Sequence, residues 1–262
     1  MAVRGRSRVL LGAAPGVGKT YAMLDEGKHL RAGGSDVVIA VVETHGRAAT
    51  AAMTEGMEVV PRHYVECRGI ELPEMDLDEV LARHPDVALV DELAHTNAPG
   101  SRNEKRWQDV EELLEAGIDV ISTVNIQHIE SLNDVVEQIT GVPQRETVPD
   151  TVLRRASQVE VVDLAPQALR DRLSSGKVYP AERIDAALSN YFRLGNLTAL
   201  RELALLWVAD EVDHALADYR SEHGIDSRWE ARERVVVALT GGREGETLLR
   251  RGARIAVRAG GG

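Results

Sequence analysis

The chain has 262 residues, and its 31 lysines and arginines against 42 aspartates and glutamates give a net charge of −11. A chain this acidic is unsuited to sequence-independent binding of a nucleic-acid backbone or an anionic membrane surface, so small ligands or proteins are the expected partners. Apolar residues make up 44% of the chain, which is enough for a globular core. Cys67 is the only cysteine, which excludes a disulfide framework and a cysteine-rich zinc site within one chain.

The sequence predicts no membrane-inserted segment. The apolar part of residues 1–16 is too short, and too soon interrupted by glycine and proline, for a signal peptide. Nowhere do 18 apolar residues follow one another. We therefore expect a cytosolic chain that makes no membrane contact of its own.

Five short apolar runs alternate with helical patterns in the first 165 residues. The runs lie at 8–12, 36–43, 86–91, 118–123 and 159–164, and the helical patterns at about 19–32, 46–56, 76–83, 104–116 and 131–140. The runs lack the strict alternation of half-exposed strands and are typical of strands buried on both faces. This order predicts an α/β fold with a mostly parallel sheet and flanking helices.

The pattern becomes helical after about residue 165. Short helices are predicted over 166–176 and 180–188, and a long amphipathic helix over 196–219. Its apolar residues recur at spacings of three and four and predict one buried face, formed by Leu197, Leu200, Ala204, Trp207, Val208, Ala215 and Leu216. We expect this helical extension, residues 166–222, to pack against the α/β domain of residues 1–165.

The last part of the chain, residues 223–262, has the pattern of a linker followed by a new α/β unit. Residues 221–234 are polar, and a strand, a glycine turn and a helix are predicted after them. A single strand and helix cannot enclose a core, so we expect here the start of a further domain that continues beyond Gly262.

A phosphate-binding loop is predicted between the first strand and the first helix. Residues 13–20, AAPGVGKT, match G-x-x-x-x-G-K-[ST] except that Ala13 occupies the first glycine position. Gly12 precedes it, and Gly16 and Gly18 remain to let the backbone turn. A strand before the motif and a helix after it are the context of a P-loop NTPase-like fold.

In that geometry the backbone N–H groups of Gly16 to Thr20 surround a phosphate at the helix N-terminus. Lys19 would reach the β and γ phosphates, and the Thr20 hydroxyl would bind magnesium. The expected nucleotide-binding residues are Ala13, Ala14, Pro15, Gly16, Val17, Gly18, Lys19, Thr20 and Tyr21. The alternative is a glycine-rich turn that binds nothing, which gives Lys19 no evident purpose.

A second carboxylate is needed to hold magnesium through water, usually at the end of a neighbouring strand. Four apolar residues lead into Asp91, which is followed directly by Glu92. Asp91 is the candidate for the magnesium shell, and Glu92 for polarising a water or hydroxyl that attacks the γ phosphate. Glu92 could equally cap the next helical turn or form an ion pair.

Three polar clusters follow predicted strands, at 43–47, 95–97 and 123–128. Because ligands bind at the carboxyl ends of strands in open α/β sheets, the clusters are candidates for sensing the γ phosphate or binding a protein substrate. Each could also consist of helix caps and loop groups. The spacing of their histidines does not require a metal site. Three basic residues could supply positive charge to the transferred phosphate, or alternatively form the solvated start of a helix: Arg102, Lys105 and Arg106.

With these motifs the chain resembles the N-terminal cytoplasmic region of the KdpD family, sensor histidine kinases of bacterial potassium homeostasis. The resemblance covers nearly the whole chain and is carried by residues 12–24, 90–134 and 190–205. Residues 234–242, RVVVALTGG, resemble the start of the universal-stress-protein-like domain of that family.

The resemblance implies that Ala13 to Thr20 bind ATP with Mg²⁺, on the cytoplasmic side of the bacterial inner membrane. It also implies that complete family members continue through four transmembrane helices to a phosphoacceptor histidine and a catalytic ATPase domain. The remainder of the kinase, its response regulator and the potassium-uptake pump complex are the implied protein partners. None of the eight histidines lies in an H-E-[apolar]-R-[ST]-P box, so histidine autophosphorylation is not expected of this chain.

Two hypotheses for the chain stay open at this point. It is either a regulatory ATP-binding module of the sensor kinase, or itself a P-loop phosphotransferase or ATPase, such as a protein serine kinase acting on the potassium-uptake system, with Lys19, Asp91 and Glu92 as catalytic residues. A nucleoside kinase of the thymidine kinase type would lack its zinc-binding cysteines. A nucleic-acid motor is disfavoured by the charge of −11.

Overall fold

The computed structural model describes residues 3–175, 188, 190–225 and 245–258. The chain forms two compact units, Met1–Glu211 and Val212–Gly262. The first unit contains the sheet and every predicted site residue. The domain boundaries expected from the sequence stay predictions.

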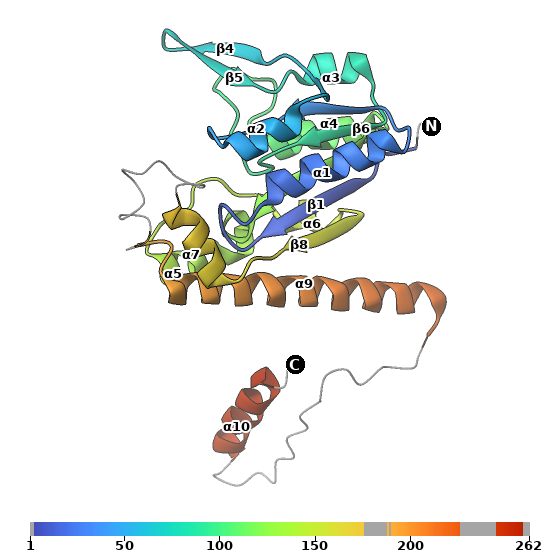
Figure 1. The fold of residues 1–262 in the computed structure, drawn as a ribbon. Helices are drawn as coiled ribbons and strands as arrows, with labels where there is room; N and C mark the ends of the chain where they lie inside the picture. Colours follow the sequence, from blue (N-terminus) through green and yellow to red (C-terminus); the bar gives the residue numbers. More distant parts are fainter. Residues whose placement is uncertain (1–2, 176–187, 189, 226–244, 259–262) are drawn as a thin grey trace. The chain divides into compact units, whose positions relative to one another are not determined.

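A six-stranded parallel sheet forms the centre of the first unit (Figure 1). Its strands are β1 (Ser7–Gly12), β2 (Val37–Val41), β3 (Glu58–Val59), β6 (Val87–Val90), β7 (Asp119–Asn125) and β8 (Gln158–Val162). They are arranged in the order β3-β2-β6-β7-β1-β8. Every residue of β2 and β6 is buried, which confirms the interpretation of these runs as strands covered on both faces. For β8 this interpretation is wrong, because β8 lies at the edge of the sheet and none of its residues is buried.

Most helices occur where the sequence predicts them, whereas α6 is not predicted. Their bounds are α1 (Lys19–Ala32), α2 (Ala48–Thr54), α3 (Leu77–Arg83), α4 (Arg106–Glu115), α5 (Asn133–Thr140), α6 (Asp150–Arg154), α7 (Pro166–Ser174), α9 (Leu194–His223) and α10 (Gly245–Arg258), with short 3-10 turns at Ile126–His128 and Glu130–Leu132. Residues 180–187 of the helix predicted over 180–188, and the strand and glycine turn predicted after residue 234, lie outside the described residues. The predicted α/β fold with a parallel sheet and flanking helices is confirmed.

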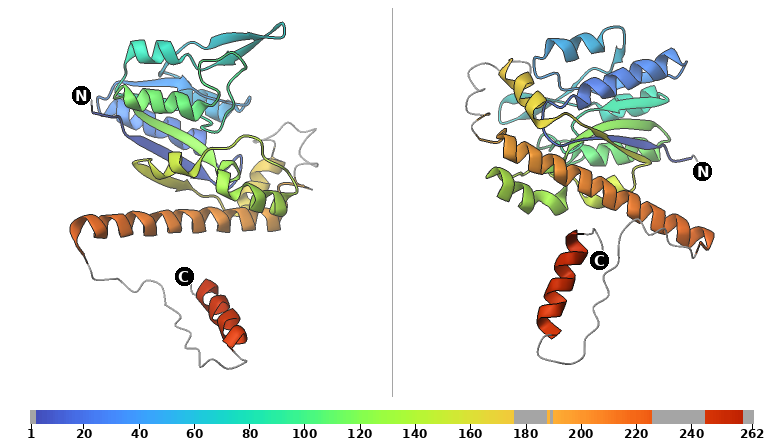
Figure 2. Two further views of the ribbon diagram at one scale, coloured as in Figure 1. Left: turned by 180° about the vertical axis from the view of Figure 1, so that it is seen from behind. Right: turned by 60° about the horizontal axis from the view of Figure 1, so that its bottom comes forward.

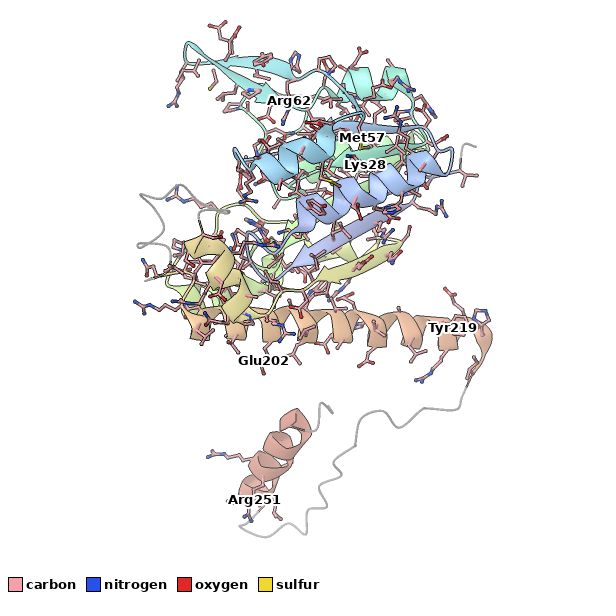
Figure 3. All side chains as sticks on the ribbon, in the orientation of Figure 1. Lys28, Met57, Arg62, Glu202, Tyr219 and Arg251 are labelled. Carbon is pink, nitrogen blue, oxygen red and sulfur yellow. The ribbon has the colours of Figure 1, made fainter. Side chains whose placement is uncertain are left out.

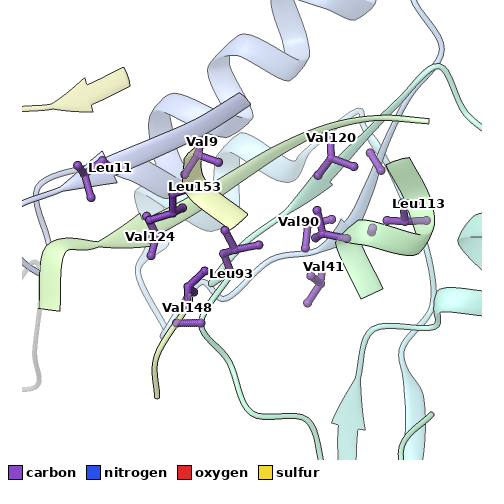
Figure 4. Close-up of a cluster of buried hydrophobic side chains, with 14 of the residues drawn as sticks. Val9, Leu11, Val41, Val90, Leu93, Leu113, Val120, Val124, Val148 and Leu153 are labelled. Atoms are coloured by element: carbon purple, nitrogen blue, oxygen red, sulfur yellow. The ribbon is translucent and has the colours of Figure 1, made fainter. Parts of the chain in front are cut away.

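Alternate residues of the central strands pack against helices on opposite faces of the sheet. On one face Leu10 lies in a cluster with Met23 and Leu24 of α1. On the other face Val9 and Leu11 pack with residues of α4 and α6, which Figure 4 shows, and with the first half of α9. Accordingly α1 lies in front of the sheet in Figure 1, whereas α4 lies in front when the molecule is seen from behind in Figure 2. The carboxyl ends of β1, β6 and β7 therefore open at one edge between two packed layers.

An antiparallel hairpin of β4 (His63–Cys67) and β5 (Ile70–Glu74) stands beside the main sheet and was not predicted. Its base is tied to the end of β2 by Arg62, labelled in Figure 3, whose Nη2 donates to the carbonyl oxygen of Val42 at 2.7 Å and to Glu43 Oε1 at 2.9 Å. The last residue of β5, Glu74, is buried.

Helix α9 begins within the first unit and continues to His223, past the predicted start of the polar linker at residue 221. On its first half the predicted apolar face is buried, from Leu197 to Trp207. Ala215 is exposed, so the prediction that it belongs to the buried face is wrong. The apolar spacing of α9 therefore continues beyond the part of the helix that is buried.

Truncation of Leu200 tests how firmly the first half of α9 is held. Leu200 is fully buried against the sheet cluster, so Leu200→Ala should lower the free energy of unfolding by about 2–5 kcal/mol. Leu206, 55% exposed on the same helix, is the matched control, and Leu206→Ala should change it by less than about 0.5 kcal/mol. Urea denaturation measures both, and equal effects would mean that α9 is not part of the cooperative core.

Candidate functional site

The loop between β1 and α1 has the geometry of an anion-binding turn. Gly16 and Gly18 adopt positive φ angles of 89° and 113°, as expected of the glycines that let this loop turn. Helix α1 begins at Lys19 with no acidic residue in its first turn, and among the described residues no side chain caps it. The first N–H groups of the helix thus remain available to an anion.

The back of the loop is fixed by packing and by one arginine. Ala14 and Val17 lie in a buried cluster with Leu169 of α7. Arg172 of α7 donates from Nη1 to the carbonyl oxygen of Gly16 at 3.0 Å. This bond and the buried cluster tie the loop to α7. Sequence reasoning missed Arg172, which lies in an ordinary amphipathic pattern.

Gly12 is required by the path of the lysine side chain. A Cβ at Gly12 would lie 2.7 Å from Val17 Cγ2 and 2.8 Å from Lys19 Cδ. Gly12→Ala is therefore expected to displace Lys19 and weaken nucleotide binding about tenfold, or about 1.4 kcal/mol. Gly195→Ala, at a helical position with open space, is the control. Calorimetric titration with Mg²⁺-ATP measures both, and unchanged affinity in Gly12→Ala would show that Lys19 does not need this path.

The structure brings Lys19, Thr20 and Asp91 to one cavity of about 110 Å³ at the carboxyl edge of the sheet. Thr20 Oγ1 lies 3.1 Å from Asp91 Oδ2 and 3.2 Å from Oδ1, although the two residues are 71 positions apart. Asp91 follows β6, two strands from β1. Lys19 Nζ donates to Asn125 Oδ1 at the end of the intervening strand β7.

Burial changes the ionisation of these groups. Loss of solvation lowers the pKa of Lys19 to about 8, although the nearby Asp91 charge opposes this shift. Burial also raises the pKa of Asp91, although its oxygens accept hydrogen bonds from Thr123 Oγ1 at 2.5 Å and the Glu43 N–H at 3.2 Å. Burial thus disfavours the charged form of both side chains. A phosphate next to the Lys19 ammonium and a metal ion next to the Asp91 carboxylate would favour the charged forms again.

The three polar clusters converge as predicted. Besides the loop residues, the cavity is lined by His45, Arg47, Asp91, Glu92, Ala94, His95, Thr123, Val124, Asn125, His128 and Glu146. Sequence reasoning missed Glu146, which comes from a segment without a motif. Of the predicted nucleotide-binding residues, Ala13, Ala14, Val17, Gly18 and Tyr21 do not line the cavity, and Tyr21 is 48% exposed beside it.

Glu92 forms an ion pair with His45 in the cavity wall, Nε2 to Oε1 at 2.9 Å. Both residues adopt left-handed backbone conformations, with φ of 56° and 49°, which are uncommon outside glycine. Although burial opposes it, the bond to His45 lowers the pKa of Glu92, and the same bond raises the pKa of His45. The ion pair foreseen as an alternative for Glu92 is present.

The three basic residues around the start of α4 do not line the cavity. Arg102 pairs with Asp78 at the surface, and Lys105 Nζ donates to Thr96 Oγ1. Arg106 is only 1% exposed, so both interpretations from the sequence, a charge for the phosphate and a solvated helix start, are wrong for it. Its guanidinium bonds instead to Glu74 of β5 and to the carbonyl oxygen of Asp91.

A family model that covers most of the chain identifies its family. The model for KdpD, described as the osmosensitive K⁺ channel His kinase sensor domain, matches residues 3–212. The chain belongs to the KdpD family. Several proteins that resemble it are named sensor protein KdpD. One from Mycobacterium tuberculosis (strain H37Rv) is 66% identical over 253 residues, covering 97% of this chain and 29% of the relative.

Two other KdpD-family relatives give the same picture. The sensor protein KdpD of Rathayibacter rathayi is 70% identical over 242 residues, covering 92% of this chain and 28% of that protein. That of Escherichia coli (strain K12) is 53% identical over 257 residues, covering 98% of this chain and 29% of that protein. The chain thus spans less than a third of the length of these relatives. Among the described helices, none combines the length and apolar character that a membrane span requires.

Proposed function

We propose that the chain is the Mg²⁺-ATP-binding cytosolic region of a sensor histidine kinase that controls potassium uptake. The observation that carries the proposal is the meeting of Lys19, Thr20 and Asp91 in one cavity, at the N-terminus of an uncapped helix. Nucleotide occupancy would bias the kinase or phosphatase state of the complete sensor through contacts that differ between states. The family and the names of the relatives support the sensor kinase.

The residues present fit a phosphate chain and a metal ion. Lys19 would contact the β and γ phosphates, and the N–H groups at the start of α1 would surround them. The Thr20 hydroxyl would hold Mg²⁺ directly and Asp91 would hold it through water. The metal would neutralise charge on the phosphate oxygens. Asn125, which accepts a hydrogen bond from Lys19 in the structure, would keep the ammonium pointing into the cavity.

Calorimetric titration of the purified chain with ATP, in Mg²⁺ and in EDTA, tests the proposal. We expect one binding site per chain and tighter binding in Mg²⁺. Absence of heat at millimolar nucleotide in both conditions would overturn it. In the cell we expect the chain at the cytoplasmic side of the inner membrane, with the remainder of the kinase and its response regulator as partners.

A second candidate function is phosphoryl transfer by the chain itself, to water or to a hydroxyl of a potassium-uptake protein. The specific observation in its favour is Glu92, whose carboxylate lines the cavity beside Lys19 and Asp91. A carboxylate there could accept the proton of the attacking hydroxyl. Transfer of radioactive phosphate from ATP distinguishes the two functions, because repeated turnover indicates an enzyme and stoichiometric binding indicates a regulatory module.

If Glu92 is the base, its pair with His45 predicts the pH dependence of turnover. The pair is complete when His45 is protonated, below a pKa that lies above its ordinary value of about 6.5. As the pH rises through that pKa, the imidazolium loses its proton and Glu92 is released. Phosphate release at saturating Mg²⁺-ATP should therefore rise as the pH increases through the raised pKa of His45. His45→Gln should remove this rise, and identical profiles for both proteins would contradict the role of the pair.

A further inference from the structure

The loop that carries both acidic candidates is held from behind by a buried arginine. We define the Asp91–Ala98 loop as residues 91–98, between the end of β6 and the turn that leads to α4. The Nη1 of Arg106 donates to the carbonyl oxygen of Asp91 at 3.1 Å, and its backbone N–H donates to the carbonyl oxygen of His95 at 3.1 Å. Arg106 thus fixes the first residue and the middle of the loop.

Glu74, at the end of the β4–β5 hairpin, completes the support. Its Oε1 accepts the Ala98 N–H at 2.7 Å, and its Oε2 lies 3.0 Å from His95 Nε2 and 3.4 Å from Arg106 Nη2. The Arg106–Glu74 pair therefore bonds the Asp91–Ala98 loop at its beginning, middle and end. It also connects the loop to a hairpin that lies outside the main sheet.

The peptide group between Asp91 and Glu92 is fixed at both ends. Its carbonyl oxygen accepts from Arg106, and its N–H donates to Thr123 Oγ1 at 3.1 Å. Thr123 in turn donates to Asp91 Oδ1 at 2.5 Å. Because Glu92 follows with φ of 56°, the plane of this peptide sets the directions in which both acidic side chains leave the backbone.

We propose that Arg106 is a positioning residue that holds the Asp91 carboxylate where Mg²⁺ needs it. The proposal rests on the Mg²⁺-ATP site proposed above. Stabilisation of the fold does not by itself explain why a buried arginine occupies this position, because its Nε has no hydrogen-bond partner among the described residues. Its bond to Glu74 is long, and buried ion pairs often stabilise less than well-packed apolar side chains. The directed bond to the Asp91 carbonyl is what an apolar residue could not supply.

The test compares the dissociation constants for ATP in Mg²⁺ and in EDTA, whose ratio we call the metal enhancement. Arg106→Lys keeps the charge beside Glu74 but loses the planar fork that reaches Asp91. We expect it to reduce the metal enhancement about tenfold, as for other residues that orient a metal ligand. Affinity in EDTA should stay within about twofold, because the hydrogen bonds of Arg106 within the described part of the chain go to Asp91, Glu74 and His95 and not to the phosphate loop or Lys19.

The control is Arg102→Lys, four positions earlier, whose ion pairs with Asp78 and Glu112 lie at the surface. Glu74→Gln is the second variant, which loosens the same loop without removing Arg106 and decides the question if Arg106→Lys fails to fold. A thermal melt of each variant checks folding. A merely structural role would lower the melting temperature and leave the metal enhancement of the folded protein unchanged.

An unchanged metal enhancement in the folded variants, with normal binding by the parent chain, would overturn the positioning role alone. Absence of ATP binding by the parent chain in both conditions would overturn the proposed function, and the positioning role with it. A selective loss of enhancement in both variants, with Arg102→Lys unaffected, would support the proposal.

Discussion

Replacement of Lys19 by alanine is expected to weaken Mg²⁺-ATP binding by about 100-fold, equivalent to about 2.7 kcal/mol. The Lys19 ammonium is buried at the cavity and, without a ligand, its charge is compensated by little more than Asp91 and the Asn125 amide oxygen. Hydrogen bonds between a buried ammonium and phosphate oxygens are among the strongest that a protein makes. Calorimetric titration of both proteins measures the loss.

Lys28, labelled in Figure 3, is the matched control for this substitution. It lies on the same helix but does not line the cavity, so Lys28→Ala should leave the affinity within about twofold. If Lys19→Ala also bound ATP within twofold of the parent chain, the nucleotide would have to bind elsewhere.

The lowered pKa of Lys19 adds a signature that a surface site would lack. Below pH 8 the amine is protonated before ATP arrives, whereas above pH 8 binding must take up a proton. Affinity should therefore fall as the pH rises through 8, by at most about tenfold per unit. Titrations at pH 8.5 in two buffers of different ionisation enthalpy should reveal the uptake in the parent chain, and Lys19→Ala should not show it.

The second large effect is expected from Asp91→Asn, which should abolish the increase in ATP affinity that Mg²⁺ provides. An amide keeps the shape of the side chain but lacks the charge that attracts the metal through its water shell. The same substitution should leave the melting temperature of the free protein unchanged or higher. Burial raises the pKa of Asp91 in the folded protein above its value in the unfolded chain. Ionisation of this carboxylate therefore lowers the stability of the folded protein once the pH exceeds the pKa of the aspartate in the unfolded chain.

Asp25→Asn is the control, because Asp25 is a half-exposed carboxylate on α1 that does not line the cavity. Both variants should be titrated with ATP in Mg²⁺ and in EDTA, and melted without nucleotide. A full Mg²⁺ effect in Asp91→Asn would place the metal on other residues, and a strongly lowered melting temperature would identify Asp91 as a structural residue instead.

The central residues of the candidate site could be located from sequence because each lies in a local pattern with a clear strand context. The turn at Lys19 and Thr20 follows one apolar run, and Asp91 ends another. Since parallel strands present their carboxyl ends at one edge, the topology brings these residues together without further information. What they bind and catalyse stays a prediction that the experiments above address.

The supporting residues could not be found in this way, because their burial depends on partners distant in sequence. Arg106 lies in a strongly polar stretch, SRNEKRWQD, and is buried only because Glu74, 32 positions earlier, and the Asp91 carbonyl surround it. The β4–β5 hairpin was missed for a local reason. Its strands are largely exposed and rich in charge, and it turns at Arg68 and Gly69 rather than at the Asn-Gly or Asp-Gly of common two-residue hairpins.

The strand order has a consequence for biosynthesis. β1 leaves the ribosome before its neighbours in the sheet, β7 and β8, and Arg8 pairs with Gln158. At about 5–20 residues per second, the nascent chain carries this apolar segment without its partners for roughly 8–30 s. During that interval the phosphate loop has no wall opposite it. Nucleotide therefore cannot assist the early steps of folding and can stabilise only a chain that has emerged as far as β8.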